Sequence, residues 1–282
     1  MADFSDILLT VDFDRTLTAT DSTIPQKNIE AIEYFMAQGG TFTVNTGRST
    51  NTFKKYLNTL PVNAPLLLMN GSARYQNGRL EKLVPIDLPL WETLETVSNL
   101  FPEMNLELQG AQNHYLYKPR QSYIRCYEAI GWDWAEAVPY TDVGPFLKFS
   151  LFGKVYENSV GGFFEGPQEE IDRFTQARKT IERMYGDKVD VFFAAPRIID
   201  VHAKGVSKLR AARDLQKELG KSILVCVGDA DNDKTMLDGA DYAYCPADGV
   251  VADQYENVCS CSEGAVADVI LNKIPEILKN EP

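Results

Sequence analysis

The chain has 282 residues, of which 44% are hydrophobic, and its formal net charge at pH 7 is −12. A chain of this length and composition can bury a sizeable core in one large or two modest domains, so intrinsic disorder is not expected. The acidic balance argues against binding to nucleic acid or to an anionic membrane surface, because both depend on clustered lysine and arginine.

The sequence also lacks the signals of membrane and secreted proteins. No apolar segment reaches the ~20 residues needed to span a bilayer, and the N-terminus lacks the basic and apolar regions of a signal peptide. The five cysteines form no Cys-x-x-Cys pair, so neither a disulfide framework nor a zinc site is indicated. We therefore expect a cytoplasmic protein with reduced thiols and with neither a membrane nor a nucleic-acid partner.

The first informative segment is 7–18, ILLTVDFDRTLT, in which an apolar run leads to two aspartates and a threonine. The run is nearly continuous, which is typical of a parallel strand that helices cover on both faces. Asp12 and Asp14 follow at the C-terminal end, the edge of an open α/β sheet where ligands bind. Two carboxylates so close repel each other unless a cation or a shared proton stabilises them. The pair alone fits a divalent metal site or a solvated turn with an aspartate cap.

The following segments continue an alternation of helix and strand. The expected elements are, in order, a helix that begins near Pro25 and ends at Gly39, a strand over 41–46, a helix over about 50–60, and a buried strand over 66–69. Asn77-Gly78 then lies between strand-like flanks, which is the strongest short signal for a β-hairpin.

Residues 84–186 show a different pattern of predicted elements, with two helices and several short strand candidates, and this pattern predicts an inserted α+β domain. The segments after it are predicted as strands over 189–194 and 198–201, a helix over 207–219 and a buried strand over 223–227. We therefore predict an α/β fold, a doubly wound and mostly parallel Rossmann-like sheet, with a core of residues 1–83 and 187–282.

Complementary chemistry gathers at the ends of three strands and at the head of one helix: Asp12 and Asp14, Thr46 and Gly47, Asp229, Asn232 and Asp233, and Lys208. The pattern Gly-Asp-x-x-Asn-Asp of the last strand end is expected by chance in only about one such chain in two hundred. It also follows an apolar strand, as the chemistry requires. The conjunction of these loops is a stronger signal than any one of them.

These motifs resemble, in this order, those of the haloacid dehalogenase-like (HAD) phosphohydrolases, specifically the Cof-like group with a type IIB cap. Residues 12–17 match the first motif, 46–48 the second, Lys208 the third, and 228–233 with Met236 the fourth. The inserted segment 84–186 matches only in position and size. Cof-like members usually carry glycine where this chain has Arg15, a difference that bears on substrate preference.

The resemblance implies a Mg²⁺-dependent phosphomonoesterase for small phosphorylated metabolites, sugar phosphates first. By the same resemblance Asp12 is the nucleophile that forms an aspartyl-phosphate, and Asp14 is the general acid and base. The remaining implied roles are phosphate binding by Thr46, Gly47, Lys208 and Asn232, Mg²⁺ binding by Asp12, Asp14 and Asp229, and orientation of Lys208 or a metal-bound water by Asp233.

Two other interpretations stay open at this point. A sugar phosphomutase of the same superfamily uses the same motifs but passes the phosphoryl group back to a sugar instead of to water. A phospho-accepting regulatory module resembling bacterial receiver domains also combines acidic residues, threonine and lysine on a doubly wound sheet. Receiver domains, however, lack an insert as long as 84–186. The physiological substrate and the oligomeric state are not indicated by any motif.

Overall fold

The computed structural model describes residues 3–57, 59–111, 113–139, 141–155 and 166–280, and the chain divides into two compact units. The first unit comprises Met1–Gly47, Lys55–Arg79 and Ser207–Pro282, and the second comprises Arg48–Lys54 and Leu80–Val206. The second unit is therefore largely an insertion into the first.

The first unit is built on a five-stranded parallel sheet in the order β14-β13-β12-β1-β2. Its strands are β1 (Ile7–Val11), β2 (Thr41–Val44), β12 (Ile223–Val227), β13 (Tyr242–Pro246) and β14 (Glu256–Val258). β1 is wholly buried and pairs with β12 on one side and β2 on the other, so that Val11 lies opposite both Val227 and Val44. The residues that follow β1, β2 and β12 consequently meet at one edge of the sheet.

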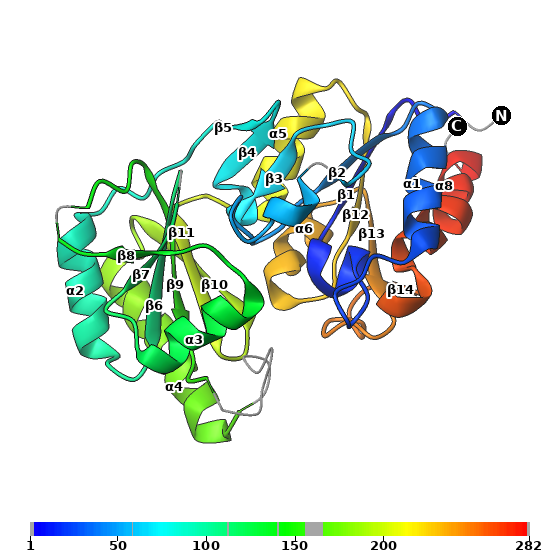
Figure 1. Cartoon of the computed structure of the whole chain (residues 1–282). Coiled ribbons are helices and arrows are strands. Elements are labelled where there is room, and N and C mark those ends of the chain that lie inside the picture. The colour runs from blue at the N-terminus through cyan, green and yellow to red at the C-terminus, as the bar shows by residue number, and fades with distance from the viewer. Residues whose placement is uncertain (1–2, 58, 112, 140, 156–165, 281–282) are drawn as a thin grey trace. The chain divides into compact units, whose positions relative to one another are not determined.

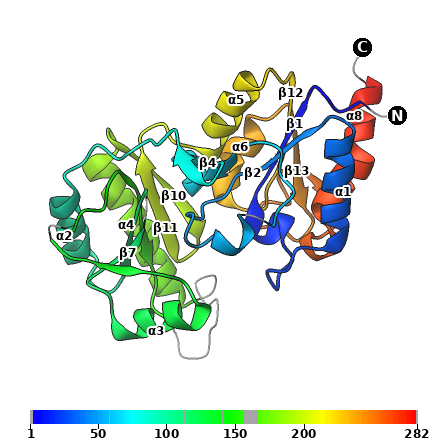
Figure 2. The ribbon, with the colours of Figure 1, turned by 45° about the horizontal axis from the view of Figure 1, so that its top comes forward.

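Helices cover both faces of this sheet (Figures 1 and 2). On one face lie α1 (Gln26–Ala37) and α8 (Ile274–Asn280), and on the other lie α5 (Lys208–Glu218) and α6 (Lys234–Asp238). Leu8 and Leu224 of the sheet pack in one apolar cluster with Leu215 of α5 and Met236 of α6. The predicted doubly wound α/β core is confirmed.

The polypeptide between β2 and the next strand differs from expectation. The predicted helix over about 50–60 is wrong, because only the turn Lys54–Tyr56 is helical, and Asn58 lies outside the described residues. Ser49 N donates to Thr52 Oγ1 at 3.1 Å, and Thr52 N donates to Ser49 Oγ at 3.4 Å. Such local bonds offer the backbone an alternative to the helical ladder.

The predicted hairpin is present. β3 (Leu66–Leu68), β4 (Ala73–Gln76) and β5 (Arg79–Glu81) form a small sheet in that order. Asn77 and Gly78 both have positive φ, 52° and 80°. This is the backbone that a two-residue hairpin turn with right-handed strand twist requires.

The second unit contains a six-stranded sheet in the order β10-β11-β9-β6-β7-β8. Its strands are β6 (Asn105–Gly110), β7 (His114–Tyr117), β8 (Ala135–Ala137), β9 (Phe146–Phe152), β10 (Val189–Ala195) and β11 (Ile198–Ala203). The helices α2 (Leu90–Leu100) and α4 (Gln168–Tyr185) contribute Leu94 and Phe174 to an apolar cluster with one face of this sheet. α3 (Gln121–Ile130) was not predicted, and it packs Tyr123 and Tyr127 against Leu116 of β7.

The second unit extends further along the chain than the sequence predicts. β10 pairs with β11, and β11 pairs with β9 of the inserted sheet, so the unit runs to Val206, whereas the prediction returns the chain to the core at residue 187. Both segments are short apolar runs, and such a run has no feature that specifies which sheet it joins. The predicted boundary at 83/84 lies within a few residues of Leu80, where the second unit resumes.

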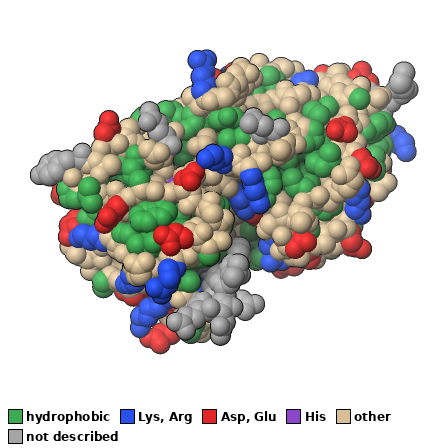
Figure 3. All heavy atoms as spheres, viewed as in Figure 1, with side chains coloured by type: hydrophobic (Ala, Val, Ile, Leu, Met, Phe, Trp, Pro, Cys, Tyr) green, Lys and Arg blue, Asp and Glu red, His purple; other side chains and the backbone are tan. Residues whose placement is uncertain are grey.

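All five cysteines are free thiols. Among the described residues, no helix combines the length and the apolar character that crossing a membrane would take. On the face shown in Figure 3, Lys and Arg side chains are interspersed with Asp and Glu.

A buried polar cluster lies on one face of the six-stranded sheet. Lys148 Nζ donates to Asp200 Oδ2 at 2.9 Å, and Ser150 Oγ donates to Asp200 Oδ1 at 2.6 Å. His202 lies opposite Lys148 in the register and is fully buried. Burial lowers the pKa of His202 to about 3, although Asp200 acts in the opposite direction.

We expect His202 to make the protein less stable as the pH falls from 6.5 towards 3. In this window the unfolded state takes up a proton and the buried imidazole does not, so protons favour unfolding. The contribution is about 2 kcal/mol at pH 5. Urea denaturation of the parent and of His202→Gln at pH 7 and pH 5 measures this contribution. From pH 7 to pH 5 the free energy of unfolding of the parent should fall by about 2 kcal/mol more than that of the variant. Equal losses would contradict the prediction.

Candidate active site

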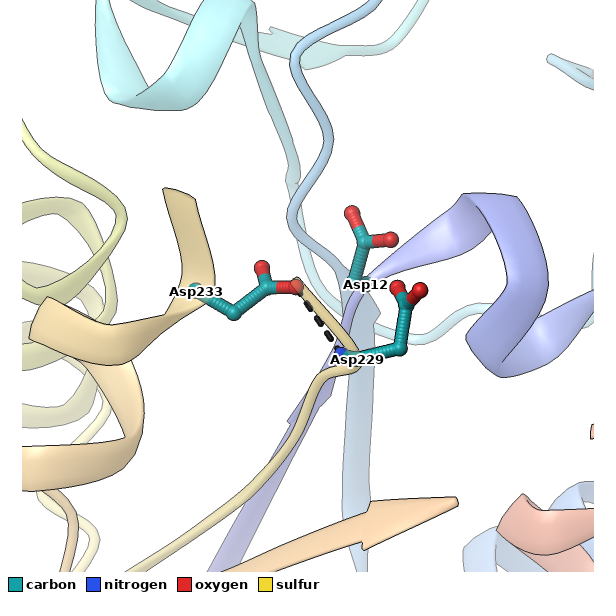
Figure 4. A group of neighbouring side chains, drawn as sticks. All are labelled: Asp12, Asp229 and Asp233. Carbon is teal, nitrogen blue, oxygen red and sulfur yellow. Dashed lines mark hydrogen bonds between the residues drawn. The ribbon is translucent and has the colours of Figure 1, made fainter. Parts of the chain in front are cut away.

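Three buried carboxylates converge where the strands of the parallel sheet end. Asp12 directly follows β1, and its N–H donates to Val227 O at 2.9 Å, so its backbone is still fixed by the sheet. Asp229 lies two residues beyond β12, and Asp233 closes the turn Asp231–Asp233. Carboxylate oxygens of Asp12, Asp229 and Asp233 lie within 4.8 Å of one another, as Figure 4 illustrates. The fold thus brings together acidic residues from the two ends of the chain.

Lys208 connects two of these carboxylates. It is the first residue of α5, and the Oγ of the preceding Ser207 caps the helix by accepting from Arg210 N at 3.1 Å. Lys208 Nζ donates to Asp12 Oδ1 at 2.5 Å and to Asp233 Oδ1 at 2.6 Å. Burial alone would lower the pKa of Lys208, but the two carboxylates outweigh it and raise that pKa above its ordinary value. Lys208 is therefore a fixed cation inside the site.

The carboxylates are costly to ionise where they lie. Burial raises the pKa of Asp12 to about 7; Lys208 opposes this rise, while Asp233 and Asp14 add to it by charge repulsion. Burial also raises the pKa of Asp229 well above its usual range, and the neighbouring Asp12 raises it further. Because one lysine does not balance this group of carboxylates, the site favours a further positive ligand.

Asp233 is held by the protein through both of its oxygens. Its Oδ2 accepts from Asp229 N at 3.0 Å and from Ala230 N at 3.1 Å, while Oδ1 accepts from Lys208. This packing requires glycine at position 228, since a Cβ there would lie 2.6 Å from Asp233 Cγ. The arrangement fits the predicted orienting role of Asp233 better than direct ligation of a metal.

Two residues absent from the predicted site also contact it. Thr16 Oγ1 donates to Asp229 Oδ1 at 3.1 Å, which couples the loop after β1 to the loop after β12. Asn45 Nδ2 donates to Lys208 O at 2.9 Å and so links the end of β2 to the first turn of α5. The Asp-x-Asp-x-Thr spacing carries a signal for Thr16. No sequence signal indicates the role of Asn45, because its partner is distant in the chain.

The other predicted site residues occupy the surrounding loops. Asp14 is half-buried in the turn Phe13–Leu17. Thr46 is buried, and its backbone is fixed by Leu67 O, which accepts from Thr46 N at 2.9 Å. Asn232 is half-buried, and within the described ranges no hydrogen bond joins its side chain to the three carboxylates. Phosphate binding by Thr46, Gly47 and Asn232 stays a prediction.

The donor set fits a hard divalent cation. Mg²⁺ takes oxygen ligands and is usually bound through one or two carboxylates together with water and substrate phosphate. Asp12 and Asp229 offer such carboxylates at one point, and burial has raised the pKa of both, so a bound dication would relieve their repulsion. The residues therefore suit magnesium better than a metal that prefers nitrogen or sulfur ligands.

The model of the haloacid dehalogenase-like hydrolase family matches residues 9–252. The chain belongs to the haloacid dehalogenase-like hydrolases, as the sequence motifs predicted. This membership in a family of enzymes disfavours the regulatory-module interpretation.

Solved structures share this fold over nearly the whole chain. A haloacid dehalogenase-like hydrolase from B. subtilis is 17% identical with a TM-score of 0.76, and the match covers 94% of this chain and 99% of that one. SMU.1108c from Streptococcus mutans UA159 is 20% identical, with a TM-score of 0.76 and coverage of 95% and 98%. BT4131, described as a subclass IIB sugar phosphatase, is 16% identical, with a TM-score of 0.74 and coverage of 94% and 98%.

Proposed function

We propose that this protein is a Mg²⁺-dependent phosphomonoesterase that hydrolyses small phosphorylated metabolites, with sugar phosphates favoured. The observation that carries the proposal is the buried Asp12 carboxylate, which Lys208 holds at 2.5 Å beside Asp229 at the ligand-binding edge of the sheet. The similarity of fold to a protein described as a sugar phosphatase supports the substrate class.

In the proposed reaction the carboxylate of Asp12 attacks the phosphorus of the ester. The bond to the leaving alcohol oxygen breaks, an aspartyl-phosphate forms, and Asp14 donates the proton that the leaving oxygen needs. Asp14 then takes a proton from a water molecule whose oxygen attacks the same phosphorus. The bond between phosphorus and Asp12 breaks, which releases inorganic phosphate and restores the enzyme.

Other residues would position these groups and stabilise developing charge. Lys208 keeps Asp12 fixed and neutralises charge next to the phosphoryl group, while Asp233 holds Lys208. Donors for the phosphoryl oxygens would come from the Thr46 hydroxyl, the Gly47 amide and the Asn232 side chain. Asp12, Asp229 and the Asp14 carbonyl would hold Mg²⁺, which when bound offsets the repulsion between a carboxylate and a phosphate dianion.

We expect chelation of divalent cations to lower the hydrolysis rate by at least about 100-fold, because the carboxylates would then repel the substrate. The assay is release of inorganic phosphate from p-nitrophenyl phosphate and from a panel of sugar phosphates, with MgCl₂ or with EDTA. Readdition of MgCl₂ to the chelated protein is the control and should restore the rate.

Two results would contradict the proposal. Hydrolysis that is equally fast in EDTA would show that the reaction does not depend on Mg²⁺. Absence of hydrolysis in MgCl₂ across the panel would show that the protein is not a phosphatase for these substrates. Conversion of a sugar phosphate into its isomer without release of inorganic phosphate would establish the phosphomutase alternative instead.

A further inference from the structure

Arg15 has an unusual backbone conformation inside the loop that carries Asp12 and Asp14. Its φ and ψ are 59° and 12°, in the left-handed region that L-residues with long side chains rarely adopt. Arg15 N donates to Thr18 Oγ1 at 3.1 Å, which helps to hold the turn. A glycine would take this conformation without cost, so the presence of arginine suggests that its side chain has a role at this position.

The side chain extends from this turn towards Asp229. Arg15 Nε lies 4.0 Å from Asp229 Oδ2, and Nη2 contacts Asp248 O at 3.5 Å. The Nε atom is buried and has no hydrogen-bond partner in the part of the chain that the structure describes, although 41% of the side chain is exposed. At 4.0 Å the two groups do not form a hydrogen bond, but their opposite charges attract each other.

The two cations of the site are divided between its carboxylates. Lys208 Nζ bonds Asp12 and Asp233, and both of these bonds are shorter than 3 Å. Asp229 Oδ1 accepts a hydrogen bond from the Thr16 hydroxyl, and Asp229 Oδ2 faces Arg15. Within the described residues, Asp229 forms its ion pair with Arg15, while Lys208 acts on this carboxylate through its charge without bonding to it, and Asp229 is a proposed metal ligand.

We propose that Arg15 is the resident counter-ion of Asp229, which balances this carboxylate when no metal is bound and weakens the binding of a divalent cation. Arg15 and the metal act on the same carboxylate, so the positive charge of one opposes the other through their mutual repulsion. The inference rests on the proposed function, because it takes the divalent cation to bind at Asp12 and Asp229. Arg15 is a positioning residue in this account, and its charge sets how tightly the site binds Mg²⁺.

The test is calorimetric titration of the metal-free protein with MgCl₂ alone, without substrate, so that it does not depend on activity. The variants are Arg15→Gln, which removes the charge, Arg15→Gly, which also relieves the backbone, and Arg15→Lys, which keeps the charge. Arg210→Gln is the matched control, since Arg210 is exposed and paired at 3.9 Å with Asp214 on α5.

The dissociation constant for Mg²⁺ should fall on the order of tenfold in Arg15→Gln and Arg15→Gly, because one positive charge is removed beside the dication. It should stay close to that of the parent in Arg15→Lys and Arg210→Gln. The metal-free melting temperature should fall in Arg15→Gln, since Asp229 loses its counter-ion, and its rise with added MgCl₂ should be larger than in the parent. Circular dichroism checks the fold, and Arg15→Gly gives the same comparison if Arg15→Gln is misfolded.

An unchanged or higher dissociation constant in both neutral variants would overturn the inference and leave the proposed function standing. Loss of inorganic phosphate binding in Arg15→Gln, with Mg²⁺ binding unchanged, would also overturn it and assign Arg15 to the substrate. Failure of the parent and all variants to bind Mg²⁺ would overturn both the inference and the metal dependence of the proposed function.

Discussion

Asp12→Asn is expected to lower the rate of phosphate-ester hydrolysis by at least about 10⁴-fold. An amide has nearly the shape of a carboxylate, and its oxygen can still accept the hydrogen bond from Lys208, but it cannot attack phosphorus or form an acyl phosphate. The loss should therefore occur in kcat with the fold intact. Initial rates with p-nitrophenyl phosphate and the sugar-phosphate panel, together with a melting curve, measure both quantities.

The matched control for this variant is Asp231→Asn. It makes the same substitution in the loop that carries Asp229 and Asp233, but Asp231 is exposed and forms an ion pair with Lys234 at 2.9 Å. Its rate should stay within a few-fold of the parent's rate, as expected for a surface pair. Substantial hydrolysis by Asp12→Asn, or an equal loss in both variants, would show that Asp12 is not the nucleophile.

Lys208→Met is expected to destabilise the metal-free protein by about 3–5 kcal/mol at pH 8, because it leaves buried carboxylates without their shared cation. The loss should be smaller at pH 5. Without Lys208, which opposes the rise, the pKa of Asp12 would exceed its present value of about 7. Protonation of Asp12 at the lower pH would then remove a buried charge. Urea denaturation in EDTA at the two pH values measures the difference.

The control for Lys208→Met is Lys217→Met, which removes an exposed lysine from the same helix and should change the free energy of unfolding little. A Lys208→Met variant as stable as the parent at pH 8 would mean that the ion pairs of Lys208 contribute nothing to the fold. A loss independent of pH would show instead that packing of the lysine side chain, and not its charge, stabilises the site.

The central strands could be predicted from the sequence because their signal is local. β1 is a nearly continuous apolar run and β12 a continuous one, and each is followed by polar residues that must lie at the sheet edge. Elements whose stability depends on distant partners could not be predicted. α3 buries only Tyr123 and Tyr127, too few to mark a helical stripe. β10 and β11 were predicted as strands but were assigned to the core. Their sequences do not show that β11 pairs with β9, and this pairing places both strands in the second unit.

The same division holds at the candidate active site. Asp12, Asp229, Asp233 and Lys208 lie in ordered motifs, so their types and spacings were sufficient to predict that they converge. The contacts of Thr16 and Arg15 with Asp229 were not predicted, although the Asp-x-Asp-x-Thr spacing marks Thr16 as a candidate. They depend on the exact path of the loop after β1, including the positive φ of Arg15, which no residue preference indicates.

The position of β1 between β12 and β2 in the parallel sheet has a consequence for synthesis on the ribosome. One edge of β1 is covered early by β2, but the other waits for β12, which begins at Ile223. At a translation rate of ~5–20 residues per second, about 210 further residues take on the order of 10–40 s. An apolar strand with an open edge is a site for aggregation. The nascent chain must therefore be shielded by chaperones or by its own partial collapse, and the ion pairs that join Asp12 to Asp233 through Lys208 can form only after residue 233 has been synthesised.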